Sequence, residues 1–488
     1  MGDSSHLFPL PKNRTHKMGK TIKSVFWSAV EQYASLGIGM IFSFIIARQL
    51  LPSDYGAIAM LAIFMSISQC FIDSGFSSAL IQKQNRTAKD LSTVFYYNLI
   101  IGVITYILLY FFSPLIASFY NQPLLIDLIP YVGLNLLIRS LTAVQLTIIQ
   151  IELKFKRIAI ITLVATLFSG FVAIYLAANG YGVWTLVYQA LVSSSTTTLL
   201  LWITSSWKPQ LLFSFSSFKE LFGYGSRLLG GSLLHTIYLN LYSLVIGKVF
   251  NSKSLGLYNR ANTWAAYPSS TLTAILSKSL FPILCQAQKN DKELIDRFFL
   301  YLRCIALIIF PCMLCMAAIA DQLIVIVLTD KWIEVVPYFR LLCIGLMFEP
   351  LQHVIWMMLN VKHRTDLSLK SEIIKKIIGA VLLIVSLPFG LYVVCISILL
   401  YSIIDMLIVS YYVNKILITI NFLKIAKILA PILLYSILLS LFAYIVAHFF
   451  SNIFYAVIIA CITSLFFYIL ILIFTGDYKI IKKHIYGK

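Results

Sequence analysis

Long apolar runs are the feature that most constrains what this chain can fold into. A transmembrane helix needs ~20 predominantly apolar residues to cross the ~30 Å hydrocarbon core of a bilayer. Only 12% of the residues are charged, where a soluble domain carries about 25%. The chain is therefore predicted to be an all-α integral membrane protein. Five runs contain no Asp, Glu, Lys or Arg, namely 91–112, 158–178, 183–206, 428–447 and 453–474.

The remaining apolar runs bring the predicted number of spans to fourteen. The stretch 377–413 would be ~55 Å long as one helix, so we expect two spans that are broken at Pro388-Phe389-Gly390. Two short basic segments lie at the ends of the chain, an arm at 1–23 and a tail at 476–488. The other seven predicted spans are 24–46, 57–80, 127–150, 222–246, 261–283, 304–320 and 336–360.

The distribution of basic residues predicts the orientation. With the N-terminus in the cytoplasm, most of the 38 Lys and Arg residues fall in inner segments, as the positive-inside rule requires. Both termini are then cytoplasmic. The net charge of +19 is explained by inner loops that face an anionic leaflet, so no nucleic-acid partner is needed. The residues outside are Arg48, Lys248, Lys253, Arg260, Lys331 and Arg340.

Two polar segments indicate an internal repeat. ARQLLPSDYG (47–56) interrupts an apolar region, and GKVFNSKSLG (247–256) follows six spans later with Gly256 in the place of Gly56. Because six is an even number of spans, the two halves share an orientation and form a parallel repeat. We expect each segment to be a tight turn on the outer side of the membrane. In the first segment, Pro52 is expected to end one helix and Gly56 to open the next.

The repeat predicts the domain organisation. Two six-helix lobes, at 24–206 and 222–413, are expected to surround a central cavity. A cytoplasmic linker at 207–221 joins the lobes, and two further helices occupy 414–475.

Five segments in order resemble a known family. The chain is similar to the polysaccharide-export branch of the multidrug/oligosaccharidyl-lipid/polysaccharide superfamily, and most of all to Wzx-type flippases of the colanic-acid group. The resemblance implies a flippase that moves an undecaprenyl-diphosphate-linked oligosaccharide from the inner to the outer leaflet of a bacterial cytoplasmic membrane. It also implies membrane lipids and polysaccharide polymerase and assembly proteins as partners. The segments are ARQLLPSDYG, DSGFSSALIQK (73–83), ELKFKR (152–157), GLYNRAN (256–262) and LTDKWIEVVPYFRLL (328–342).

Basic residues in or beside the spans are the candidate substrate ligands. Arg139 lies near the middle of a predicted span, where a charge is costly and marks a functional site by default. A guanidinium can hold a phosphate with two donors at once. The alternative is a structural arginine paired with a carboxylate. Arg48 and Arg260 flank the outer turns and Lys278 lies near a span end, so they are weaker candidates.

Carboxylates and a histidine in the spans are the candidate ion-coupling groups. Glu349 and His353 are four residues apart and share a helical face, while Glu31 and Asp405 are single mid-span acids. Each could carry a proton or sodium ion that drives the cycle, or be a satisfied structural group. We expect no cofactor and no metal site. Cys312 and Cys315 form a CxxC motif without a second ligand pair, so packing is the favoured interpretation.

No enzyme signature is found in the sequence. There is no phosphate-binding P-loop, nucleophile elbow or zincin motif, so a transporter is predicted. Two alternatives remain, a cation-coupled multidrug exporter of the same fold and a membrane-embedded polysaccharide polymerase or ligase.

Overall fold

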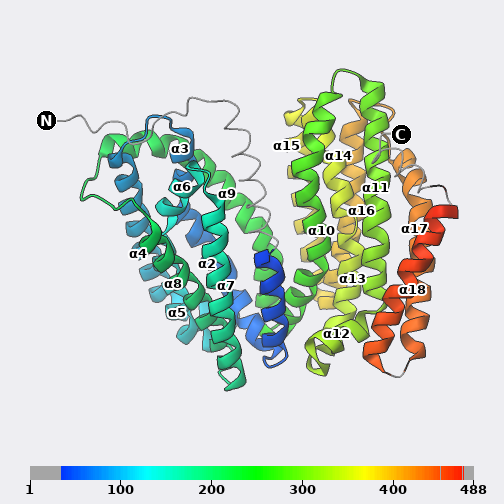
Figure 1. The fold of residues 1–488 in the computed structure, drawn as a ribbon, viewed down its shortest axis with the longest axis horizontal. Coiled ribbons are helices and arrows are strands. Elements are labelled where there is room, and N and C mark those ends of the chain that lie inside the picture. The colour runs from blue at the N-terminus through cyan, green and yellow to red at the C-terminus, as the bar shows by residue number, and fades with distance from the viewer. Residues whose placement is uncertain (1–33, 451, 475, 477–488) are drawn as a thin grey trace. The chain divides into compact units, whose positions relative to one another are not determined.

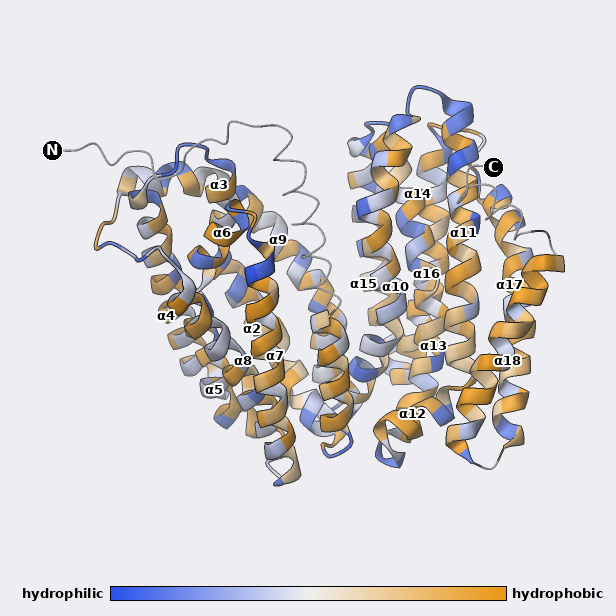
Figure 2. Ribbon diagram, in the orientation of Figure 1, coloured by the Kyte–Doolittle hydropathy of each residue, from blue (hydrophilic) through white to orange (hydrophobic). Residues whose placement is uncertain are grey.

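The computed structural model describes residues 34–450, 452–474 and 476, and its regular elements in these ranges are all helices. The chain divides into two compact units, one ending at Gly256 and the other beginning at Leu257 (Figure 1). The all-helical prediction is confirmed. Figure 2 shows helices that are largely hydrophobic along their length in both units, with hydrophilic residues at the connections.

The first unit contains eight numbered helices and the start of a ninth. A shorter apolar helix, Ala34–Ala47, precedes them. α10 begins in this unit and continues into the second. The helices are α2 Pro52–Asp73, α3 Phe76–Gln82, α4 Ala88–Tyr120, α5 Leu124–Ser140, α6 Ala143–Ile151, α7 Phe155–Ala178, α8 Trp184–Thr204, α9 Phe215–Val249 and α10 Ser252–Gln286.

The second unit holds the rest of α10 and the remaining elements. Two short 3-10 helices, η1 and η2, interrupt the α-helices. The elements are α11 Asp291–Ala318, α12 Ala320–Leu328, η1 Asp330–Val335, α13 Val336–Leu346, α14 Glu349–Val361, α15 Thr365–Ser386, η2 Leu387–Phe389, α16 Leu391–Asn414, α17 Phe422–Phe449 and α18 Ile453–Phe474.

Within the described residues, 11 helical segments are long and apolar enough to cross a membrane. Ala34–Ala47 is shorter than these, and α10 and α15 are not among them. The count of fourteen spans therefore stays a prediction. The break that the sequence predicts in 377–413 is confirmed, since η2 and Gly390, which has a φ of 94°, separate α15 from α16.

Several predicted spans are discontinuous, among them 57–80, which is interrupted at Ser74-Gly75 between α2 and α3. The span predicted at 127–150 consists of α5 and α6, which are interrupted at Leu141-Thr142. The span predicted at 336–360 consists of α13 and α14, which are interrupted at Met347-Phe348. These are the fourth and tenth predicted spans, so they occupy corresponding places in the predicted repeat. Helix breaks in corresponding spans of a repeat mark the binding region in many transporters.

The two repeated polar segments lie against each other within the first unit. A Cβ on Gly56 would lie 1.7 Å from the Ser252 carbonyl oxygen, and a Cβ on Gly256 would lie 1.8 Å from the Pro52 carbonyl oxygen. Each glycine thus faces the carbonyl four residues before the other glycine, and only glycine permits so close a backbone contact. The first turns of α2 and α10 cross here.

The predicted role of the two helix-boundary residues in the first segment was wrong. Pro52 does not end a helix but is the first residue of α2, and Gly56 lies inside α2. Proline suits the first helical position because its missing N–H would have no helical partner there. Asp54 completes this start, since its carboxylate accepts a hydrogen bond from Leu51 N at 2.9 Å.

α9 packs along α2, α3 and α4 in the first unit. Gly75, with a φ of 70°, and Gly225 permit the contact, since a Cβ on Gly225 would lie 2.5 Å from the Ser74 carbonyl oxygen. Next to it, Phe76, Leu80, Phe95 and Leu221 form a buried apolar cluster. The predicted lobe and linker boundaries are not tested by these contacts and stay a prediction.

Candidate functional site

A cavity of about 450 Å³ in the first unit contains Arg139. It lies among α2, α5 and α8, and its walls alternate between apolar and polar side chains. No carboxylate belongs to its lining, so Arg139 gives the cavity a positive charge. The other polar lining residues are Ser66, Gln69, Asn135, Ser193 and Ser194.

Arg139 occupies the last turn of α5, directly before the helix break. The Arg139 carbonyl accepts from Thr142 Oγ1 at 2.8 Å, and the Leu141 carbonyl accepts from Trp202 Nε1 at 3.1 Å. The break is therefore stabilised by side chains that replace the missing helical donors. It leaves the exposed Arg139 guanidinium at a helix C-terminus, where the helix dipole favours a cation.

One carboxylate lies close to this cavity. Gln69 Nε2 donates to Asp73 Oδ1 at 3.1 Å, and Asp73 is near enough to Arg139 for a direct electrostatic attraction. The structural alternative, an arginine with a carboxylate neighbour, thus has support in the geometry. Even so, a guanidinium has five donors, which leaves donors for an anionic ligand in the cavity.

The second unit contains a polar network around Glu349 and His353. Glu349 Oε2 accepts from Ser269 Oγ at 2.9 Å, and His353 Nε2 lies 2.8 Å from Ser277 Oγ. Glu349 is the first residue of α14, so it follows the break in its span as Arg139 precedes the break in the other. The network joins α14 to α10.

Asp405 belongs to the same region of the second unit. It is buried on α16, and its Oδ1 lies 3.3 Å from Lys375 Nζ on α15, which is also buried. The contact is electrostatic, because Asp405 Oδ1 makes no hydrogen bond. Glu372 Oε1 lies 2.6 Å from the same ammonium, and Glu349 acts electrostatically on Asp405. Two carboxylates, those of Asp405 and Glu372, thus contact one lysine.

The other predicted site residues lie elsewhere. Arg48 is exposed at the turn that follows the helix Ala34–Ala47. In the second unit, Arg260 is 8% exposed and its guanidinium lies 5.9 Å from the centre of a Trp332 ring, while Lys278 is exposed on α10. Glu31 falls outside the described residues. The roles predicted for these four residues stay untested.

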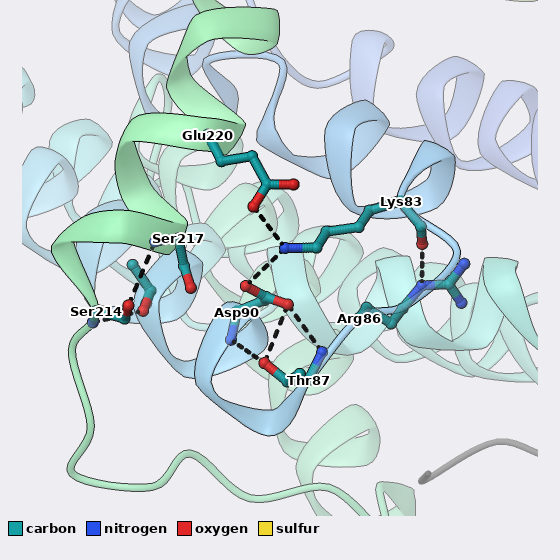
Figure 3. A network of polar contacts seen from close by, with 8 residues as sticks. Lys83, Arg86, Thr87, Asp90, Ser214, Ser217 and Glu220 are labelled. Carbon is teal, nitrogen blue, oxygen red and sulfur yellow. Dashed lines mark hydrogen bonds and ion pairs between the residues drawn. The ribbon is translucent and has the colours of Figure 1, made fainter. Parts of the chain in front are cut away.

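An ion-pair network fixes the start of α9 in the first unit (Figure 3). Lys83 Nζ lies 2.9 Å from Glu220 Oε2 on α9 and 3.2 Å from the buried carboxylate of Asp90 on α4. Burial lowers the pKa of Lys83, but the hydrogen bonds to Glu220 and Asp90 outweigh it and the pKa is raised above its ordinary value. Lys83 therefore stays charged and links α9 to α4.

Some residues of these sites were not predicted. Gln69 and Asn135 are uncharged, and such residues inside spans most often serve helix packing. Lys375 was not among the predicted site residues, although the sequence holds a signal for its partner. Lys375 and Asp405 are each 15 positions from Gly390, the predicted break, and residues equidistant from a helical hairpin turn lie at the same depth.

Residues 45–337 match a protein family described as polysaccharide biosynthesis protein. Among curated proteins, the chain is 26% identical over 359 residues to the lipopolysaccharide biosynthesis protein WzxC of Escherichia coli K12, a match that covers 73% of each chain. It is 27% identical over 304 residues to the teichuronic acid biosynthesis protein TuaB of Bacillus subtilis, covering 62% of this chain and 63% of that protein. The succinoglycan biosynthesis transport protein ExoT of Rhizobium meliloti is 22% identical over 327 residues, which cover 67% of this chain and 66% of ExoT.

Solved structures share the fold. The inward closed conformation of the lipid II flippase MurJ superposes with a TM-score of 0.74 at 16% identity and covers 92% of this chain and 99% of its own. An inward-facing multidrug transporter of the MATE family superposes with a TM-score of 0.60 at 14% identity, covering 80% and 98%. At such identities these matches establish the fold alone, which this chain shares with MurJ and with the MATE transporter.

Proposed function

The chain belongs to the polysaccharide biosynthesis protein family, and from that premise we propose that it flips an undecaprenyl-diphosphate-linked oligosaccharide from the inner to the outer leaflet of a bacterial cytoplasmic membrane. It is a multi-pass membrane transporter of the flippase type and not an enzyme. The relatives WzxC, TuaB and ExoT are named for the biosynthesis or transport of cell-surface polysaccharides, which supports this substrate class.

The observation that carries the proposal is Arg139 at the helix break, inside a cavity lined by hydroxyl and amide groups. A diphosphate that enters a low-dielectric region needs a cation that stays charged, and a guanidinium meets this need. Hydroxyl and amide side chains can exchange hydrogen bonds with the phosphates and the first sugar. The cavity volume is that of a small-molecule site, so it would hold the headgroup region and not a whole repeat unit.

We further propose that a proton or sodium gradient drives the cycle through the second unit. Glu349, His353 and Asp405 are there, and the two carboxylates of Asp405 and Glu372 contact the single ammonium of Lys375, an excess of acid that favours a cation. No nucleotide-binding motif is present in the sequence to supply another energy source.

The substitution Arg139→Ala tests the proposed role of the guanidinium. We expect it to reduce flipping of a labelled undecaprenyl-diphosphate oligosaccharide in proteoliposomes by at least about tenfold, the scale of one charge-assisted contact. Arg139→Lys should recover part of the rate, because an ammonium cannot form the two-pronged contact. Arg364→Ala is the control, since Arg364 pairs with Asp366 on an exposed connection.

Two results would contradict these proposals. Normal flipping by Arg139→Ala would remove Arg139 from the substrate site. Transport of a cationic dye such as ethidium, without transport of the lipid-linked oligosaccharide, would instead identify a multidrug exporter. The coupling proposal is tested separately, by flipping with both the proton and sodium gradients collapsed, and an unchanged rate would contradict it.

A further inference from the structure

A second cavity in the first unit, of about 790 Å³, is unrelated to the Arg139 site. It lies between the later parts of α4 and the early parts of α5, next to the start of α8. Aromatic rings form much of its wall, and one carboxylate, Asp127, belongs to it. The rings are those of Tyr106, Tyr110, Phe111, Tyr131 and Trp184.

The rings form the wall of an open cavity, since those of Tyr110, Phe111 and Tyr131 are 52%, 73% and 44% exposed. Tyr131 and Trp184 meet edge to face with ring centres 5.1 Å apart, which directs their faces at different angles. Aromatic side chains at a membrane surface usually form a belt of separate anchors. Here residues from three helices converge on one cavity with a carboxylate in its wall.

The charge of this cavity indicates the chemical class of its ligand. Its lining contains no Lys or Arg, and the Asp127 side chain makes no hydrogen bond or ion pair with the residues that the structure describes. Pro130 also has no N–H to donate to the Ile126 carbonyl in the preceding turn. Aromatic faces with a carboxylate and a carbonyl are the groups that bind an organic ammonium.

The surface beside the cavity indicates where such an ammonium comes from. Phe112 and Leu115 on α4 are 50% and 64% exposed beside Phe111 of the cavity wall, so a membrane-spanning α4 presents them to acyl chains. A soluble amine would not use these contacts, whereas a phospholipid would place its chains on them and its headgroup in the cavity. We propose that this cavity binds phosphatidylethanolamine, with its ammonium at Asp127 and among the rings.

Native mass spectrometry of the full chain in detergent, with phosphatidylethanolamine or phosphatidylglycerol added, tests the proposal. We expect wild type to retain the ethanolamine lipid about tenfold better, on the scale of an ion pair plus a cation–π contact. Asp127→Asn should abolish this preference and Asp127→Glu should keep it. Tyr131→Leu, which leaves the carboxylate in place, should reduce it.

The control is Asp330→Asn, which removes an exposed carboxylate of the second unit and should leave the preference unchanged. An unchanged preference in both Asp127→Asn and Tyr131→Leu would overturn the proposal. Displacement of the lipid by an equal concentration of ethanolamine would also overturn it, because the ligand would then be a soluble amine. The measurement requires no transport, so its outcome is independent of the proposed flippase function.

Discussion

Arg139 and Glu349 could be identified from the sequence because each is an ionisable residue within an apolar run. An ionisable side chain within a span costs free energy, so it is retained only where the fold has a use for it. In the structure, Arg139 precedes the helix break of its span and Glu349 follows the helix break of the corresponding span, although their roles remain to be tested. Single-residue reasoning works here because the signal is the contrast between one side chain and its neighbours.

The same reasoning fails for residues whose meaning depends on a partner. Asn135 is an ordinary polar residue until α2 and α8 bring Gln69 and Ser193 to the same cavity. Lys375 lies in a basic segment of the sequence, and its burial follows from the packing of α15 on α16. Such assignments need the tertiary contacts that a linear pattern does not contain.

The pair formed by Lys375 and Asp405 leads to a prediction on stability. Lys375→Met would leave Asp405 and Glu372 without their cation, and we expect it to lower the free energy of unfolding by about 3–5 kcal/mol. Asp405→Asn should cost less, because Lys375 keeps its 2.6 Å contact with Glu372. Thermal unfolding in detergent gives the comparison, and equal losses in the two variants would contradict this ordering.

At the scale of elements, the crossing of α2 and α10 depends on two glycines. Gly56→Ala or Gly256→Ala would place a methyl group less than 2 Å from a carbonyl oxygen of the other helix. The helices must then separate, and we expect a loss of stability of at least about 1–3 kcal/mol. The measurement is the unfolding temperature of each variant in detergent.

Gly230→Ala provides the matched control for this crossing. Gly230 lies inside α9, and a Cβ there would meet no atom within 4 Å. Alanine in an open helical position raises stability by about 0.5–1 kcal/mol. If all three alanine variants behaved alike, the close contact between α2 and α10 would not be the cause of any loss.

The connection between α9 and α4 makes a second prediction at this scale. Asp90 is 1% exposed, whereas the Glu220 side chain is 63% exposed. Lys83→Met should therefore destabilise the protein by about 1–3 kcal/mol, because it leaves a buried carboxylate without its cation. Glu220→Gln should change stability by less than about 1 kcal/mol, as for exposed pairs. Urea unfolding compares the two variants, and a larger loss of stability in Glu220→Gln than in Lys83→Met would contradict this prediction.

Pro52 was assigned to the wrong end of a helix and the break at Ser74-Gly75 was not predicted, but some element boundaries that carry Pro or Gly were predictable. The break at Pro388-Phe389-Gly390 is such a case, because Gly390 takes a positive φ that other residues avoid. The interruption of α5 and α6 at Leu141-Thr142 carries no Pro or Gly, and it depends on side chains such as Trp202 that cap the free carbonyls. Local sequence therefore does not reveal it.

At the scale of the whole molecule, the fold class followed from hydropathy, since helices are the form in which apolar runs of this length span a bilayer. The contact of Gly56 with the turn at Ser252 also agrees with the pairing of the two segments in the sequence. The few sequence identities between the two halves of the repeat do not determine how their helices superpose, because that depends on tertiary structure.

The last prediction concerns orientation in the membrane. It rests on the distribution of basic residues and on whether the number of spans is even or odd. The separation of α15 from α16 adds one crossing, provided that both helices span, and this returns the C-terminal tail to the side of the N-terminus. The basic residues of that tail then obey the positive-inside rule. In a background without the native cysteines, an impermeant thiol reagent added outside intact cells should label Lys253→Cys and not Gly476→Cys. Outside labelling of Gly476→Cys would show an odd number of spans, and either α10 or α15 would then lose its place as a crossing helix.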